Sequence, residues 1–562
     1  MSDEIKNNEV LIEEDKDYDE LLGKFENPKE SASSSKKKNS HIKALIICII
    51  AVVVLVGAGA LLIFAPKGEP ESKSSGGAAQ VKTEIGKDKV RELKVKTDSN
   101  GKITQNGSGE LVGKVPADVT EIKIKNSKGS YTLLSYTPKK KTKETDPDTG
   151  KTKYKTEETQ YTLKGYENFK LQDGIPDEVA NSCSTMEFKS VISENAGSNL
   201  SDFGLDKPRA VATVTFEDGT KAIIKVGADA AQQLGTYVMY GSNKTVYLCA
   251  SEQPSKLLYG VTDFISKEIN KSISDEGSAE FSRLTLSGTH FKNNIVLKPN
   301  SDTKHISNTH IITSPYSDFA DDTEASQVQG AIRGLNAESV AAVKPNSGTI
   351  AKYGLSNPYA KLDAVYSDAT VRLIASKPDS KGNCYLMKTG GNVIYKIGRA
   401  SIPWIDTTAE KLLTKYVFKP ELSSLKQMSV TLSKKTYDFD IKTTVTTSKD
   451  ENGEETSSSD TRTKYNGNEI EEGNFETYFG NANLITKADN SSKNASGSPA
   501  LTIKYTYESG RKPDTVSFYK SGTKYIAVVN SKTVGTVIST YVEKLIDQTP
   551  EVAQDKEVKT FW

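Results

Sequence analysis

Hydrophobic and polar positions alternate over many short stretches of the chain after about residue 118. Clear examples are Val211–Phe216 and Lys221–Val226, which are separated by a short Glu-Asp-Gly turn. A period of two predicts strands with one buried face, and short polar turns predict that neighbouring strands pair antiparallel. Helical patterns interrupt the strands near Pro176–Glu187 and Ser255–Ile269. We therefore expect an α+β fold with mainly antiparallel sheets in this part of the chain.

One short motif repeats and divides this part of the chain into modules. Phe203-Gly-Leu-Asp-Lys-Pro208 recurs 150 residues later as Tyr353-Gly-Leu-Ser-Asn-Pro358. The glycine permits a turn with positive φ, the leucine can anchor that turn in a core, and the proline suits the start of an edge strand. The residues of this predicted structural motif are Gly204, Leu205, Pro208, Gly354, Leu355 and Pro358. We interpret the motif as a turn signal and not as a binding site.

Around each motif the predicted elements follow the order ββ-α-β(n)-α, and a degenerate third copy without the motif ends near residue 550. This pattern predicts three tandem modules after an N-terminal segment. The predicted divisions are a disordered polar tail (1–43), a transmembrane helix (44–65), a linker with short strands (66–118), module 1 (119–272), module 2 (273–420), module 3 (421–550) and a C-terminal tail (551–562).

The transmembrane prediction rests on Ala44–Ala65, which contains no charged residue, Asn, Gln or Pro. As a helix, this segment would be about 33 Å long, enough for a hydrocarbon core of about 30 Å. A buried core helix would be shorter and amphipathic, and a signal peptide would not follow such a long acidic segment. Lysines crowd the N-terminal flank, so the positive-inside rule puts residues 1–43 in the cytoplasm. We expect a single-pass protein of the cell membrane, anchored in the lipid bilayer through residues 44–65, with its C-terminal part extracellular.

The composition argues against several functions. The 562 residues include 74 Lys and Arg against 73 Asp and Glu, without the basic excess of a typical nucleic-acid binder. The four histidines and four cysteines provide few ligands for a metal, and no Walker, zinc or Gly-x-Ser-x-Gly motif occurs. We predict no catalytic residue, no cofactor and no metal site, so the chain is not expected to be an enzyme.

Three histidines, three cysteines and one acidic turn are the candidates for a metal site or a disulfide. His305 and His310 are five residues apart, which places them on opposite faces of a strand, and His290 is further away. The Asp146-x-Asp148-x-Gly150 turn resembles half of a calcium loop but is better explained as a hairpin turn. A Cys183–Cys249 disulfide is open as an alternative to free buried thiols, and either state would leave Cys384 without a partner in the module.

Tyrosines are numerous on the predicted hairpins. They could form a recognition face for a glycan or peptide, although cross-strand packing would also explain them. The residues of this possible face are Tyr237, Tyr240, Tyr247, Tyr385 and Tyr395.

The repeated motif, the strands after it with Phe-Glu-Asp-Gly, and the Tyr-Val-x-x-x-x-x-x-x-Val-Tyr hairpin resemble the domain of unknown function 4340 family, over roughly residues 120 to 550. The resemblance implies a single-pass bacterial membrane protein with large extracytoplasmic α+β repeats. It also implies an association with ABC transporter components of the gliding-motility or export type, and it supplies no catalytic residues.

We therefore expect a non-enzymatic, membrane-anchored extracytoplasmic protein that is accessory to an ABC-type transport or cell-envelope system. The expected partners are the lipid bilayer and the permease or ATPase subunits of such a transporter, and no nucleic acid. The alternative is a free-standing cell-surface module that binds wall polysaccharide or an external ligand.

Overall fold

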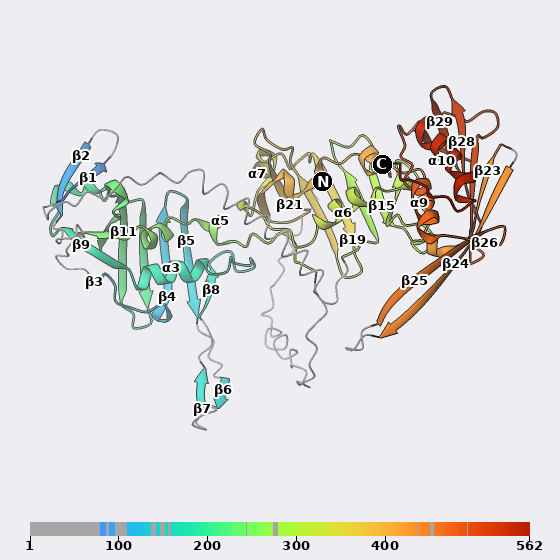
Figure 1. Cartoon of the computed structure of the whole chain (residues 1–562). Helices are drawn as coiled ribbons and strands as arrows, with labels where there is room; N and C mark the ends of the chain where they lie inside the picture. Colours follow the sequence, from blue (N-terminus) through green and yellow to red (C-terminus); the bar gives the residue numbers. More distant parts are fainter. Residues whose placement is uncertain are drawn as a thin grey trace, which may run out of the picture. The chain divides into compact units, whose positions relative to one another are not determined.

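The computed structural model shows three large antiparallel sheets, each built from one continuous stretch of the chain (Figure 1). All of them lie in the second of two compact units, Gly76–Trp562. The structure describes residues 79–85, 89–95, 109–136, 142–145, 152–155, 159–242, 244–273, 279–433, 435–449, 455–491 and 493–561.

Sheet 1 has nine strands in the order β3-β9-β13-β12-β11-β10-β4-β5-β8. Its strands are β3 (Gly109–Glu110), β4 (Val119–Asn126), β5 (Gly129–Tyr136), β8 (Gln160–Leu163), β9 (Glu187–Ser193), β10 (Ala210–Phe216), β11 (Lys221–Asp229), β12 (Thr236–Tyr240) and β13 (Val246–Cys249). Its helices are α3 (Ile175–Ser184), α4 (Glu252–Lys256) and α5 (Val261–Phe264), with 3-10 helices η2 (Pro116–Asp118), η3 (Gly197–Phe203) and η4 (Ala231–Gln233).

Sheet 2 has nine strands in the order β17-β16-β15-β14-β19-β20-β21-β22-β18. Its strands are β14 (Arg283–Ser287), β15 (Ile295–Pro299), β16 (His310–Ser314), β17 (Asp318–Phe319), β18 (Ser339–Val343), β19 (Ala360–Val365), β20 (Thr370–Ala375), β21 (Asn383–Lys388) and β22 (Val393–Gly398). Its helices are α6 (Asp322–Gly330), α7 (Ser347–Lys352) and α8 (Ala409–Leu412), with η5 (Arg399–Ser401) and η6 (Pro403–Ile405).

Sheet 3 has eight strands in the order β26-β25-β24-β23-β27-β28-β29-β30. Its strands are β23 (Leu425–Leu432), β24 (Lys435–Lys449), β25 (Glu455–Tyr465), β26 (Asn468–Ile470), β27 (Leu501–Tyr507), β28 (Asp514–Ser521), β29 (Lys524–Val529) and β30 (Lys532–Ile538). Its helices are α9 (Glu472–Asn483) and α10 (Ser539–Val552), with η7 (Leu422–Ser424). Two further two-stranded pairs are β1 (Ala79–Ile85) with β2 (Lys89–Val95), and β6 (Thr142–Thr145) with β7 (Thr152–Lys155).

Sheets 1 and 2 share one topology. If eight main strands are numbered along the chain from β4 or β14, their order in space is 3-2-1-5-6-7-8-4 in both sheets. Sheet 3 follows the same order but has no fourth strand among its described residues. A single bridge between Asp489 and Thr536 occupies that edge. In its described residues, the third module thus lacks the fourth strand together with the Gly-Leu-x-x-Pro turn that follows this strand in the other two.

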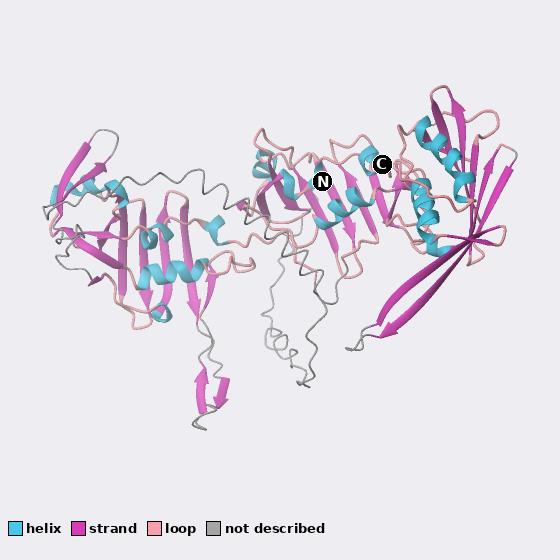
Figure 2. Ribbon diagram, viewed as in Figure 1, coloured by secondary structure: helices cyan, strands magenta, loops and turns pink. Residues whose placement is uncertain are grey.

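Alternating burial explains how each sheet packs. Ala210, Ala212, Val214 and Phe216 of β10 are buried, and the residues between them are only partly covered. The buried face packs against helices: Val179 and other apolar residues of α3 belong to the same core as β10. In Figure 2, α3 lies across the strands of sheet 1. The long helices therefore complete the main core from one face.

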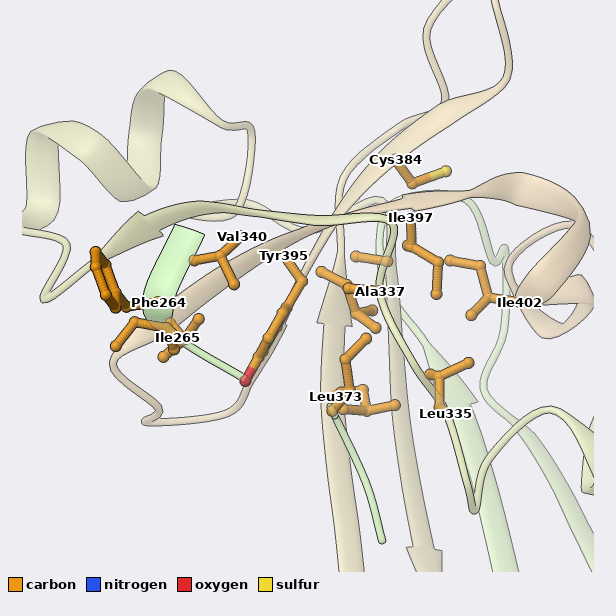
Figure 3. Packing of buried hydrophobic residues seen from close by; sticks show 14 of the residues in the cluster. Phe264, Ile265, Leu335, Ala337, Val340, Leu373, Cys384, Tyr395, Ile397 and Ile402 are labelled. Carbon is orange, nitrogen blue, oxygen red and sulfur yellow. The ribbon is translucent and has the colours of Figure 1, made fainter. Parts of the chain in front are cut away.

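An extended segment, residues 265–271, joins sheet 1 to sheet 2 by backbone hydrogen bonds on both sides. It pairs with the residues just before α3, through a bridge between Leu171 and Ile265. It then pairs with the residues just after α6, where the Ile269 N–H donates to the Leu335 carbonyl at 2.8 Å. Figure 3 shows Phe264 and Ile265 beside Val340 and Tyr395, so one hydrophobic core continues across this junction.

The junction between sheets 2 and 3 repeats this construction with residues 412–421. Leu413 forms a bridge with Ala320, just before α6, and Tyr416 forms one with Thr486, just after α9. Each linker therefore pairs first with the segment before the helix α3 or α6 of its own module. It then pairs with the segment after the helix α6 or α9 of the next module.

The predicted fold class, α+β with one membrane-spanning helix, is wrong for the described residues, which form three large, mainly antiparallel sheets with short helices. Each module contains a third opening strand (β8, β16 or β25) that the predicted ββ-α order omits. The helix predicted over Ser255–Ile269 breaks into α4 and α5.

Among the described residues, no helix is long and apolar enough to cross a membrane, contrary to the single-pass membrane description predicted from the sequence. The predicted span, Ala44–Ala65, and the tail before it lie outside the described residues.

Candidate functional sites

The Gly-Leu-x-x-Pro turns close a second, smaller core on the face of the sheet away from the long helices. Gly204 and Gly354 have φ values of 64° and 71°. The helices before the two glycines end in the same way. The Leu205 N–H donates to the Leu200 carbonyl at 2.9 Å, and the Leu355 N–H donates to the Ile350 carbonyl at 3.0 Å. These 6→1 bonds are typical of a helix C-terminus capped by glycine. Leu205 and Leu355 are both buried in these small clusters.

In sheet 2 the turn borders a hollow of about 350 Å³, which we call the tyrosine–lysine hollow. The C-terminal end of α7, the turn and the ends of β20 and β21 contribute its walls. Its lining residues are Thr289, Lys352, Tyr353, Gly354, Asn357, Tyr359, Ser376, Lys377 and Tyr385. Three aromatic rings and two ammonium groups thus meet at one place, and no carboxylate is among the lining residues.

Contacts within the hollow fix the rings. The Tyr353 and Tyr385 rings lie 4.5 Å apart between centroids, and the Tyr359 ring lies 4.6 Å from that of His290. Ser376 is buried, and its hydroxyl accepts the Tyr385 N–H at 2.9 Å. Burial, with a contribution from the charge of Asp406, raises the pKa of Tyr359, so its hydroxyl stays protonated at neutral pH.

The equivalent place in sheet 1 is filled. Tyr237, which occupies the position of Tyr385, is only 1% exposed and packs on Phe203. Gly227 takes the place of Ser376, and its α-carbon faces the Phe203 carbonyl so closely that a Cβ would overlap it. Arg209 takes the place of Tyr359 and forms a two-pronged ion pair with Asp229. The same backbone therefore carries a closed, charge-balanced surface in module 1 and an open, positively charged one in module 2.

The structure does not bring the predicted tyrosine face together. Tyr237 and Tyr395 are buried in separate clusters, and Tyr247 packs on the Phe188 ring at 4.9 Å. Tyr240 packs against the main core. Only Tyr385 lines the hollow. Tyr353 and Tyr359, which the sequence prediction missed, are in or beside the second Gly-Leu-x-x-Pro element.

The three described histidines lie in three different environments. His290 stacks on Tyr359, His310 is buried against Phe281 with its pKa lowered by burial, and His305 lies at the junction between sheets 2 and 3. In the described part of the chain, no three His, Cys, Asp or Glu side chains gather as metal ligands would.

The three described cysteines are free and buried, so the alternative Cys183–Cys249 disulfide does not form. Burial raises the pKa of Cys183 to about 12 and, against a small opposing effect of Lys189, that of Cys249 to about 12. These thiols are structural side chains and not reactive ones.

A polar cluster joins the loop after β15 to the turn after β27. His305 contacts Asp302 through Nδ1 at 2.5 Å and Ser509 through Nε2 at 2.9 Å. This chain of contacts resembles that of a Ser-His-Asp triad. However, the Arg511 Nε lies 2.9 Å from the second oxygen of Asp302, so His305 shares this carboxylate with an arginine. We interpret the cluster as a contact that holds sheets 2 and 3 together.

A second candidate surface is the outer part of the β24–β25 hairpin, residues 441–449 and 455–462, which we call the arm. The two strands pair continuously from Phe439 and Tyr465 to Lys449 and Glu455. β23 pairs with β24 only as far as Asp440, and β26 pairs with β25 only from Thr463. Among the described residues, the arm therefore has no second neighbour on either edge (Figure 1).

Most described side chains of the arm are polar and exposed, whereas Ile441 and Thr461 at its base are buried. Thr443 and Thr461 share a hydrogen bond at 3.0 Å near its base. Beyond them Val445 is 62% exposed. In module 1 the β6–β7 hairpin is inserted between β5 and β8, which correspond to β24 and β25 in the shared strand order.

A comparison with protein families identifies two stretches of this chain, residues 161–358 and 312–482, as Domain of unknown function (DUF4340). Together these cover more than half of the 562 residues. The chain belongs to the DUF4340 family. The two DUF4340 stretches begin in β8 and β16, which hold the same position in sheets 1 and 2, and each stretch includes one inter-module linker. No curated protein and no solved structure matches the chain.

Proposed function

We propose that this DUF4340 protein is a non-enzymatic interaction protein that contacts a partner protein through the arm of its third module. The observation that carries the proposal is the pairing pattern of β24 and β25. In the described arm, two strands extend beyond the sheet with both outer edges unpaired. An isolated two-stranded hairpin is marginally stable in water, and an open edge is a template for another strand.

The chemistry of the arm favours an added strand over a hydrophobic interface. Its exposed residues include Thr444, Thr446, Ser458 and Ser459, and β-branched threonine suits a strand. Main-chain hydrogen bonds provide the affinity in this mode of recognition, and alternate side chains provide specificity. The proposed partner therefore contributes an extended segment that pairs with an edge of the arm.

The accessory role in an ABC-type transport or cell-envelope system is the second part of the proposal. It comes from the family resemblance. Each linker between modules pairs by backbone hydrogen bonds with the modules on both sides of it. This pairing supports a role in which the chain holds several similar modules together. In this role the arm binds a transporter subunit.

The test uses a photo-crosslinking amino acid at Val445 in the full chain in intact cells, with Ile223 as the control position. Ile223 is an exposed strand residue of sheet 1, far from the arm in sequence. We expect an adduct with one defined protein from position 445 only, and its loss when residues 442–462 are replaced by an Asn-Gly turn. Identification of the adduct as a permease or ATPase subunit supports the accessory role, and another protein supports interaction alone. Equal adducts from both positions would contradict the whole proposal.

A further inference from the structure

The tyrosine–lysine hollow carries positive charge that no carboxylate in its lining balances. Lys352 and Lys377 both line it and are exposed. In the described part of the chain, neither ammonium group forms a salt bridge, although Lys352 lies over the Tyr353 ring at 5.7 Å. A lysine ammonium group is a compact charge that binds carboxylates and phosphates. An anionic ligand group would therefore find two cations here without an acidic competitor in the lining.

Aromatic and amide groups occupy the rest of the hollow. The rings of Tyr353, Tyr359 and Tyr385 provide flat apolar surface with hydroxyl groups at their edges, and Asn357 adds an amide donor and acceptor. Small-ligand sites typically combine such apolar walls with a few placed polar groups. The volume of about 350 Å³ is at the lower end of the usual range for such sites.

The hollow is a specific feature of module 2. In module 1, Gly227 leaves room for the close approach of the Phe203 carbonyl, and the Phe203 ring packs on Tyr237 at 5.1 Å. Arg209 there forms an ion pair with Asp229. The closed arrangement of module 1 is sufficient to pack the fold that the two modules share. Module 2 instead keeps an open space with two cations.

We propose that the tyrosine–lysine hollow binds a sugar residue that carries a carboxylate or phosphate group. The sugar ring packs on the tyrosines and bonds to Asn357, and its anionic group lies near Lys352 and Lys377. Because both lysines are exposed, a residue within a longer polysaccharide can enter as well as a free sugar. This site is independent of the arm and of the partner protein proposed for it.

The binding test is isothermal titration calorimetry of the full chain with tetragalacturonate. Its fully methyl-esterified form has the same sugar rings without the charges and serves as the matched ligand control. We expect the charged form to bind about tenfold more tightly, as for one charged hydrogen bond gained. Titrations with glucose 6-phosphate and with inorganic phosphate then show whether the hollow prefers a carboxylated sugar, a phosphorylated sugar or an anion without a sugar.

Protein variants locate the site. Lys377→Gln and Tyr385→Ala should each weaken binding about tenfold, whereas Lys377→Arg should retain it. Lys298→Gln is the matched control, because Lys298 is an exposed strand lysine of the same sheet outside the hollow. Tyr385→Phe keeps the ring packing and separates loss of binding from loss of folding.

Three results would overturn the proposal. The first is equal affinity for the charged and esterified sugars, and the second is equal weakening by Lys377→Gln and Lys298→Gln. The third is binding of a glutamate oligopeptide as tightly as tetragalacturonate, which would identify the hollow as a site for acidic peptides. None of these results would affect the arm proposal.

Discussion

His305 and Ser509 are 204 residues apart in the chain, yet the imidazole Nε2 lies 2.9 Å from the serine hydroxyl. The histidine also contacts Asp302, and its backbone carbonyl accepts the Glu421 N–H. One residue of module 2 therefore contacts both the linker and a turn of module 3. The contact is built from polar groups, so we expect it to be a weaker part of the junction than the buried core.

We predict that His305→Ala opens this junction locally. Loss of the hydrogen bonds and of the ring contact with Tyr507 should lower the local opening free energy by about 1–3 kcal/mol. Hydrogen exchange of the Ser307 and Glu421 amides, which both bond across the junction, should become faster. Exchange in β10 and β11 provides the internal control. Unchanged exchange at both junction amides would show that His305 does not hold the linker.

The closed surface of module 1 leads to a second prediction. A Cβ at position 227 would overlap the Phe203 carbonyl and approach Leu205 within 2.9 Å. Gly227→Ala should therefore lower the free energy of unfolding by about 1–3 kcal/mol, as overpacked cores do. The measurement is a urea unfolding curve.

Gly480→Ala is the matched control, because Gly480 lies inside α9 with no heavy atom within 4 Å of its Cβ position. The same substitution should stabilise the protein there by about 0.5–1 kcal/mol. Shifts of the same sign at both sites would contradict the packing argument.

This pair of sites also shows what the sequence could and could not predict. The repeated Gly-Leu-x-x-Pro element and the alternation of Val211–Phe216 predict the turn and the strand, because both depend on neighbouring residues. Tyr237 and Tyr385 have equivalent sequence positions but different exposure. The difference depends on Gly227 and Ser376, which are distant in sequence from the helix ends that cover them.

The predicted ββ-α order omitted one opening strand of each module for a related reason. The third opening strand is short in modules 1 and 2, where β8 has four residues and β16 has five, and the pairing of β8 with β5 becomes visible only in three dimensions. The linkers also lack a clear periodic pattern, since their hydrogen bonds go to segments of two different modules. Local pattern thus predicted strand pairs and the repeat. The order of strands, the junctions and the hollow depend on contacts between distant residues.

Buried thiols and phenols predict sensitivity to alkaline pH. Burial raises the pKa of Cys183 to about 12 and that of Tyr366 to about 12, whereas the unfolded groups titrate near 9 and 10. The folded state therefore holds these protons at a pH where the unfolded state has lost them. The stability from each group is complete below its unfolded pKa and is lost as the pH rises through the folded value.

We expect unfolding midpoints in urea to fall progressively between about pH 9 and pH 12. The thiols of the folded protein should also resist alkylation at pH 8, and denaturation should expose all three described cysteines. Rapid modification of Cys183 in the folded state, or a midpoint that rises in this range, would contradict the assignment of burial as the cause.

The ion pair between Lys487 and Asp318 gives the last prediction, because its two members differ in access to water. The Lys487 Nζ lies 3.8 Å from the Asp318 carboxylate, with the lysine side chain 3% exposed and the aspartate side chain 20% exposed. Burial lowers the pKa of Lys487, and the attraction of Asp318 opposes this effect. A buried charge that loses its partner is more destabilising than the loss of the pair.

We therefore predict that Asp318→Asn destabilises the junction by about 3 kcal/mol, because it leaves the Lys487 ammonium buried and uncompensated near Lys532. Lys487→Met should be close to neutral, since it removes the buried charge and leaves Asp318 in contact with water. The double variant should recover most of the loss caused by Asp318→Asn alone. Urea unfolding of the four proteins measures the coupling. A Lys487→Met protein as unstable as Asp318→Asn would show that the ion pair itself stabilises the junction.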